Sequence, residues 1–381
     1  AGNMLVKIGY KKTALIAMAV GVLGLFTQYL SSLFGANLDV FTLGGFAIKL
    51  NFIIYLLGAF ICGFCVCMLN TVVNPMLNLL GGGGNKGNQL IQTGGALNSL
   101  SGTLTPLFVG ALIGTVTAQT AMTDVAPLLF IAMGVFASAF IIISFIAIPE
   151  PHLRKGNVEK EKFAHSPWHF RHTLLGVVGI FIYVGIEIGI PGTLNFYLAD
   201  SSEKGAGLLV DGAAIGGAIS AIYWLLMLVG RSASSAISGK ISSRTQLIVV
   251  SATAICFVLI AIITPKEVTL SMPGYSVDKG FQMAQVPVSA LFLVLCGLCT
   301  SVMWGGIFNL AVEGLGKYTA QASGIFMMMV VGGGVLPLVQ QFISDAVGYM
   351  ASYWLIIVLL AYLLFYGLVG CKNVNKDIPV E

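Results

Sequence analysis

Residues 125–148 read Val125-Ala-Pro-Leu-Leu-Phe-Ile-Ala-Met-Gly-Val-Phe-Ala-Ser-Ala-Phe-Ile-Ile-Ile-Ser-Phe-Ile-Ala-Ile148 and contain no charged side chain. As a helix, this stretch is long enough to cross the hydrocarbon core of a bilayer, which is about 30 Å thick. Comparable apolar stretches recur along the chain and predict ten membrane spans. They cover about residues 13–34, 50–80, 88–117, 124–148, 171–198, 212–236, 246–264, 288–312, 320–343 and 350–370.

The composition agrees with an all-α polytopic membrane protein. Of the 381 residues, 57% are hydrophobic and 9% are charged, whereas a soluble domain carries roughly 25% charged residues. The stretches are too long and too uniformly apolar for the strands of a membrane barrel. Because the membrane distribution of charge explains the net charge of +4, it does not indicate nucleic-acid binding.

Lysines and arginines predict the orientation of the chain. With the N-terminus in the cytoplasm, fifteen of the nineteen basic residues fall in cytoplasmic segments, and both termini lie inside. The outer segments hold only Lys49, Lys204, Lys266 and Lys279. We therefore predict a multi-pass protein of a bacterial cytoplasmic (inner) membrane.

The chain also repeats itself at a nearly constant spacing. Lys7-Ile-Gly-Tyr-Lys11 returns as Lys240-Ile-Ser-Ser-Arg244, and Met68-Leu-Asn-Thr-Val-Val-Asn74 returns as Met303-Trp-Gly-Gly-Ile-Phe-Asn309. This predicts two parallel, pseudo-symmetric halves. The halves are residues 1–148 and 171–381, joined by a cytoplasmic linker, 149–170. Since the second copy begins near residue 170, the first would begin about two helices before Ala1, giving twelve helices of which ten are present.

Several motifs carry a resemblance to a known family. Gly2-Asn-Met-Leu-Val-Lys-Ile-Gly-Tyr-Lys-Lys12 resembles the turn between the second and third helices of the major facilitator superfamily, with Val6 in place of its usual aspartate. Within that superfamily, the chain resembles the fucose/glucose–galactose proton symporters. The motifs are Asn70-Thr-Val-Val-Asn74-Pro75, Asn98-Ser-Leu-Ser-Gly-Thr-Leu-Thr-Pro106-Leu107, Tyr183-Val-Gly-Ile-Glu187 and Gly332-Gly-Gly-Val-Leu-Pro337-Leu338.

The resemblance implies a monomeric major facilitator fold that transports a monosaccharide such as fucose, glucose, galactose or a similar hexose with a proton, by alternating access. It does not select the sugar. Asn70 stands where the fucose-type members carry glutamate and the glucose/galactose-type members carry glutamine.

Glu187 is the candidate proton-coupling residue, since the other carboxylates lie in loops, tails or span edges. An unpaired carboxylate in a membrane is costly, so it lines a cavity, accepts hydrogen bonds or is protonated. The alternative is a permanently bonded structural acid. Arg231, near the cytoplasmic end of its span, is interpreted as an anchor that extends toward the interface or as a gate partner.

Amides inside the spans are candidate sugar ligands, because each offers donors and acceptors to hydroxyl groups. Trp304, in a run of small residues, could stack on the apolar face of a pyranose ring or simply pack. Interhelical hydrogen bonding is the alternative for the amides. The full candidate set for substrate binding is Asn70, Asn74, Asn98, Asn195, Trp304, Asn309 and Gln340.

No catalytic residue, metal site or cofactor is predicted, and a proton gradient is expected as the energy source. Cys62-Gly-Phe-Cys65-Val-Cys67 lacks a second thiol pair or a histidine beside it, which favours free thiols over a metal cluster. There is no phosphate-binding loop for ATP. A drug or metabolite exporter of the same fold, a membrane-embedded enzyme and a non-transporting sugar sensor are the alternative functions. The enzyme is disfavoured because His152, His165, His169 and His172 all lie in or beside the central loop.

Overall fold

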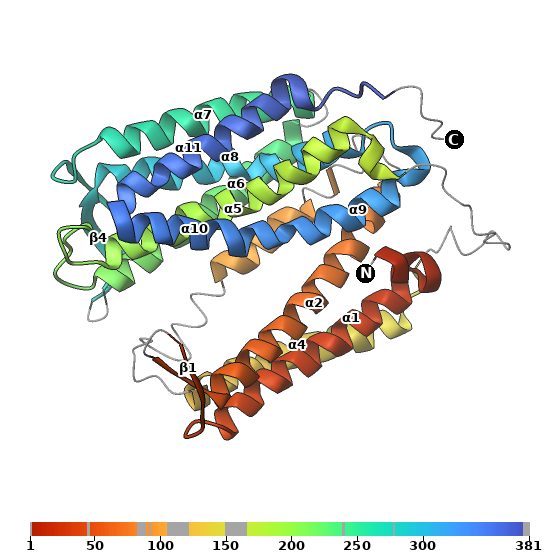
Figure 1. Ribbon diagram of the computed structural model, residues 1–381, viewed down its shortest axis with the longest axis horizontal. Coiled ribbons are helices and arrows are strands. Elements are labelled where there is room, and N and C mark those ends of the chain that lie inside the picture. The colour runs from red at the N-terminus through yellow and green to blue at the C-terminus, as the bar shows by residue number, and fades with distance from the viewer. Residues whose placement is uncertain are drawn as a thin grey trace. The chain divides into compact units, whose positions relative to one another are not determined.

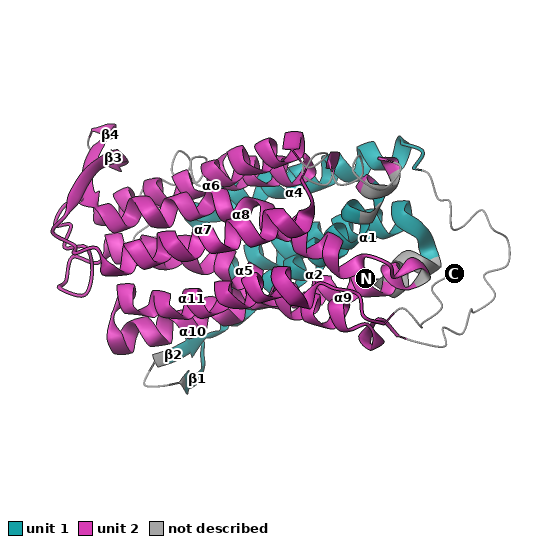
Figure 2. Ribbon diagram, turned by 90° about the horizontal axis from the view of Figure 1, so that it is seen from above, with its two compact units in different colours: residues 1–76, 107–162 teal, residues 77–106, 163–381 magenta. Residues whose placement is uncertain are grey.

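The computed structural model describes residues 2–43, 46–81, 89–90, 93–104, 122–148, 166–237, 241–276 and 279–375. They form the helical elements of Figure 1. The contacts divide the chain into two compact units, which Figure 2 shows in different colours. Unit 1 comprises residues 1–76 and 107–162, and unit 2 comprises residues 77–106 and 163–381. Each unit is described by itself.

Unit 1 is built from three long helices and a hairpin. They are α1 (Gly2–Leu33), β1 (Asp39–Leu43), β2 (Phe46–Lys49), α2 (Leu50–Leu80) and α4 (Met122–Phe145). Helix α1 bends at Gly9, whose φ of 85° lies in the left-handed region that glycine adopts without a steric penalty. After the bend, Ala14 and Met18 pack with Val72 of α2 in a buried cluster that Phe136 of α4 covers.

Unit 2 holds the remaining helices. They are α5 (Arg171–Ala199), α6 (Gly212–Ile237), α7 (Ser243–Ile263), α8 (Val288–Val312), α9 (Thr319–Met328), α10 (Gly332–Val347) and α11 (Tyr349–Phe365). Residues 93–104 are helical as well. Helices α5 and α8 are central, and 67% of the most apolar 18-residue stretch of each helix is buried. Side chains on these two helices can therefore be shielded from lipid by protein on several sides.

The approach of α10 to α5 depends on small residues. A Cβ atom at Gly332 would collide with the backbone of Phe181, and one at Gly185 would collide with Leu336. A single 3-10 turn, Met329–Val331, separates α9 from α10 directly before Gly332. The glycines at positions 185 and 332 therefore let the two helices approach closely.

Two β-hairpins occupy equivalent places in the chain. One joins α1 to α2, and the other, β3 (Thr269–Ser276) with β4 (Gly280–Pro287), joins α7 to α8. The amide of the first residue of each following helix donates to a carbonyl before its hairpin: Leu50 N to Leu38 O at 2.8 Å, and Val288 N to Val268 O at 2.9 Å. The same order of helix, hairpin and helix in both units supports the internal repeat predicted from the sequence.

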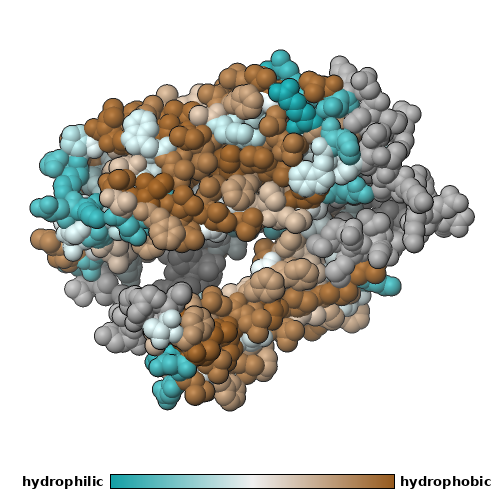
Figure 3. Space-filling view, in the orientation of Figure 1, coloured by the Kyte–Doolittle hydropathy of each residue, from teal (hydrophilic) through white to brown (hydrophobic). Residues whose placement is uncertain are grey.

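Among the described residues, nine helices are long and apolar enough to cross a membrane, and they correspond to nine of the ten predicted spans. The tenth, 88–117, is helical at residues 93–104, and most of the rest lies outside the described residues. Only 6% of the most apolar stretch of α4 is buried, so nearly all of this apolar helix lies on the surface of its unit. Figure 3 shows the same hydrophobic surface along the helices, with hydrophilic side chains gathered toward their ends.

Candidate functional site

The central feature of unit 2 is a buried ion pair between α5 and α6. The Oε1 atom of Glu187 lies 3.0 Å from Nη2 of Arg231, and the two side chains are 14% and 8% exposed. One turn before Glu187, the hydroxyl of Tyr183 accepts a longer hydrogen bond from the same Nη2 at 3.4 Å. A buried carboxylate and guanidinium are tolerated when they are paired and their remaining polar atoms are satisfied.

Arg231 also binds two groups of the helical segment 93–104, which belongs to the same unit. Its Nη1 donates to Gly95 O at 2.8 Å and to Ser99 Oγ at 2.9 Å. Its Nε donates to Ser301 O of α8 at 3.4 Å. The fixed, planar fork of a guanidinium can reach several acceptors at once. Arg231 therefore joins four helical segments around one positive charge.

The interpretation of Arg231 as an anchor that extends toward the interface is wrong. Its side chain points into the protein, where a carboxylate and oxygen acceptors compensate the charge that would otherwise be desolvated. Sequence reasoning missed its contact with Glu187. The available signal was a lone acid in one span and a basic residue in the next span, since charges inside spans tend to pair with one another.

Trp304 lies beside this ion pair. It is half-buried on α8, and its ring centroid is 6.0 Å from that of Tyr183, with the planes tilted by 55°. The structure thus brings together Glu187, Arg231, Tyr183 and Trp304 as one cluster of polar and aromatic side chains. Asn309, farther along α8, is half-buried.

Two predicted amides have a buried side-chain oxygen between helices. The Oδ1 atom of Asn195 is buried against α6 near Gly216 and accepts no hydrogen bond from the residues that the structure describes. Gln340 is completely buried on α10. Its Oε1 lies against Gly189, and its Nε2 donates to Ser352 Oγ of α11 at 3.5 Å. In this conformation both amides contribute to helix packing, and their contact with a substrate stays a prediction.

The other amides are more open. Asn98 is exposed, although its neighbour Ser99 is buried against Arg231. On α2 of unit 1, Asn70 is exposed and Asn74 is half-buried. Their exposure leaves their amide groups accessible to a hydroxyl-bearing ligand.

The described residues contain no group of three or more His, Cys, Asp or Glu side chains that could hold a metal ion. Within the cysteine run, Cys65 is buried while Cys62 and Cys67 are half-buried, and all three are free thiols. The chemistry of the site therefore rests on one acid, one guanidinium, hydroxyl groups, amides and an aromatic ring.

The long apolar helices and the ion pair buried among them define a polytopic membrane protein, and its family shows it to be a transporter rather than an enzyme. The sequence matches the Major Facilitator Superfamily over residues 1–334, and the chain belongs to this superfamily. It is 29% identical over 379 residues to a glucose/galactose transporter of Brucella abortus biovar 1 (strain 9-941), a match that covers 98% of this chain and 81% of that protein. It is also 36% identical to the L-fucose-proton symporter of Escherichia coli (strain K12), over 61 residues, 16% of this chain and 14% of that protein.

A solved structure shows the same fold. The crystal structure of the E. coli fucose:proton symporter FucP superposes with a TM-score of 0.74 at 18% identity and covers 98% of this chain and 86% of that chain. The predicted fold class and family resemblance are thereby confirmed.

Proposed function

We propose that this protein is a secondary active transporter that carries a monosaccharide together with a proton, by alternating access. Its membership of the superfamily and the names of its relatives support a hexose such as glucose, galactose or fucose as the substrate. The observation that carries the proposal is the buried ion pair of Glu187 and Arg231.

Only one residue of this pair can change its charge. The guanidinium of Arg231 stays protonated, so Glu187 is the residue that takes up a proton. Protonation would neutralise the carboxylate and weaken its interaction with Nη2 from an ion pair to a hydrogen bond, while Nη1 would keep its bonds to Gly95 O and Ser99 Oγ. The cluster then gains a net positive charge, and this change in electrostatics can favour a different arrangement of the helices that Arg231 joins.

The surroundings of the pair suit a sugar. Trp304 offers an aromatic face beside Tyr183, and aromatic rings pack against the apolar face of a pyranose. Amides can donate to and accept from ring hydroxyls. Asn98 and Asn309 of the same unit retain the exposure that such contacts require. Asn70 and Asn74, on α2 of unit 1, remain sugar ligands predicted from the sequence.

We also propose a location and an oligomeric state for the protein. The basic residues favour a bacterial cytoplasmic membrane with both termini inside, and the described helices leave broad apolar surfaces for lipid. We propose that the protein acts as a monomer with no cofactor and that the proton gradient supplies the energy.

Transport in proteoliposomes tests the function directly. The chain should accumulate one or more of glucose, galactose and fucose when an inward proton gradient is imposed, and a protonophore should abolish the accumulation. A sodium gradient of the same size at constant pH should be ineffective. Accumulation driven by sodium alone would contradict proton coupling, and failure to exchange any hexose would contradict the sugar assignment.

The exposed amides give a further prediction. Asn70→Leu and Asn98→Leu should each weaken sugar binding by about 1–3 kcal/mol, because a sugar hydroxyl loses its partner in a desolvated site. This corresponds to a roughly 5- to 150-fold higher Kd, measured by counterflow or calorimetry. Asn51→Leu, a change at the far end of α2, serves as the control. Unchanged affinity in both variants would assign these amides to packing.

A further inference from the structure

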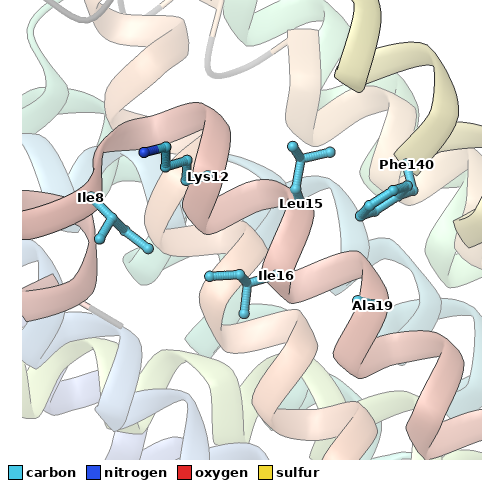
Figure 4. A pocket seen from close by; sticks show the side chains of 6 residues that line it. All are labelled: Ile8, Lys12, Leu15, Ile16, Ala19 and Phe140. Atoms are coloured by element: carbon cyan, nitrogen blue, oxygen red, sulfur yellow. The ribbon is translucent and has the colours of Figure 1, made fainter.

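A shallow apolar groove runs along the surface of unit 1 between α1 and α4. It has a volume of about 390 Å³ and is lined by Ile8, Lys12, Leu15, Ile16, Ala19 and Phe140. Figure 4 shows the α1 side chains along one side of the groove and the ring of Phe140 facing them from α4. Ile16 remains 40% exposed and Phe140 37% exposed. The groove is therefore open to the surroundings of the unit.

The bend in α1 shapes one end of this groove. Ile8 precedes the bend at Gly9, and Lys12 follows it by less than one turn. Beside them, Nζ of Lys11 donates to Ser144 O near the end of α4 at 2.8 Å. This bond ties the two helices together, while the side chain of Lys12 stays exposed at the groove.

Charge is distributed unevenly along the groove. The sequence at the bend carries Lys7, Lys11 and Lys12, whereas the carboxylates in the described part of unit 1 are Asp39 and Asp124. Asp39 follows the opposite end of α1, and Asp124 lies in the first turn of α4, which runs antiparallel to α1. Those two carboxylates therefore lie too far from the Lys12 ammonium to neutralise its charge under physiological screening. An apolar groove with a cation at one end is complementary to a lipid acyl chain with an anionic headgroup.

We propose that this groove binds an anionic phospholipid of the cytoplasmic leaflet, with one acyl chain along Leu15, Ile16 and Phe140 and the headgroup phosphate at the Lys12 ammonium. The orientation follows from the excess of basic residues on the cytoplasmic side. The inference does not depend on which solute the protein transports.

Native mass spectrometry of the purified full chain tests the proposal. The detergent-solubilised protein is titrated with phosphatidylglycerol or phosphatidylcholine of identical acyl chains. Phosphatidylglycerol should be retained preferentially, and Lys12→Gln should lower its occupancy about fivefold, the effect of one lysine near an anionic headgroup. Phosphatidylcholine retention should change little in this variant.

Two further variants separate the headgroup from the acyl chain. Ala19→Leu adds side-chain volume to the groove and should reduce retention of both lipids. Lys49→Gln removes one positive charge at the end of β2, away from the groove. It should leave the retention of both lipids unchanged. Equal retention of both lipids by the unmodified chain, or equal losses in Lys12→Gln and Lys49→Gln, would overturn the proposal.

Discussion

Replacement of Glu187 by glutamine should abolish sugar accumulation driven by a pH gradient, while sugar exchange across the membrane continues. Glutamine resembles the protonated acid at every pH and still accepts a hydrogen bond from Arg231 at the position of Oε1. Exchange survives because it does not require release of the proton. Paired assays of pH-driven uptake and sugar counterflow in proteoliposomes measure the two activities separately.

Glu203→Gln is the matched control, since Glu203 is an exposed acid outside the spans. It should leave both assays unchanged, and thermal melting checks the folding of each variant. Full pH-driven accumulation by Glu187→Gln would remove this residue from the coupling mechanism. Loss of both activities together with a lowered melting temperature would instead make Glu187 a structural acid.

Replacement of Arg231 by leucine is expected to destabilise the protein by about 3–5 kcal/mol, the cost of leaving one partner of a buried pair uncompensated. The carboxylate of Glu187 loses its counter-charge, and Gly95 O and Ser99 Oγ lose their donor. The loss should be smaller at acid pH, because a protonated Glu187 needs no counter-charge. Thermal melting of the purified variant across a pH series measures the effect.

Two comparisons separate this effect from the general cost of losing an arginine. Arg244 donates to Gly367 O and Leu368 O at a helix end, and within the described part of the chain it forms no ion pair with a buried carboxylate, so Arg244→Leu should destabilise the protein less. In the Arg231→Leu background, Glu187→Gln should restore part of the lost stability because it removes the uncompensated charge. Equal losses at Arg231 and Arg244, with no rescue, would show that the ion pair contributes little.

The helices could be predicted from the sequence because hydropathy is a local property. The hairpins do not follow from hydropathy. Pro273 and Gly274 are residue types that usually mark a turn, yet both lie within β3, paired with Met283 and Gln282 of β4. An isolated two-stranded hairpin consists of edge strands alone, and an edge strand tolerates a proline whose missing N–H faces away from its partner.

The contacts of the site were harder to predict because they join residues far apart in the chain. Glu187 stood out as a lone acid, but hydropathy does not reveal which faces of two spans meet. Arg231 is 44 positions from Glu187 and 132 from Ser99. The sequence drew attention to Asn98, whereas the neighbouring Ser99 faces the guanidinium, because successive side chains point about 100° apart around a helix. Identifying these partners required the tertiary packing.

The two hairpins also have a mechanical consequence. Each hairpin holds the end of one long helix close to the start of the next through strand pairing and one further backbone hydrogen bond. Leu50 N donates this bond at the first hairpin, and Val288 N donates it at the second. This pairing resists separation of the joined helix ends. We therefore expect α1 and α2 to move together, and α7 and α8 to move together. Helix bending during a transport cycle is then expected at connections without a hairpin. The short 3-10 turn at Met329–Val331 between α9 and α10 is one such connection.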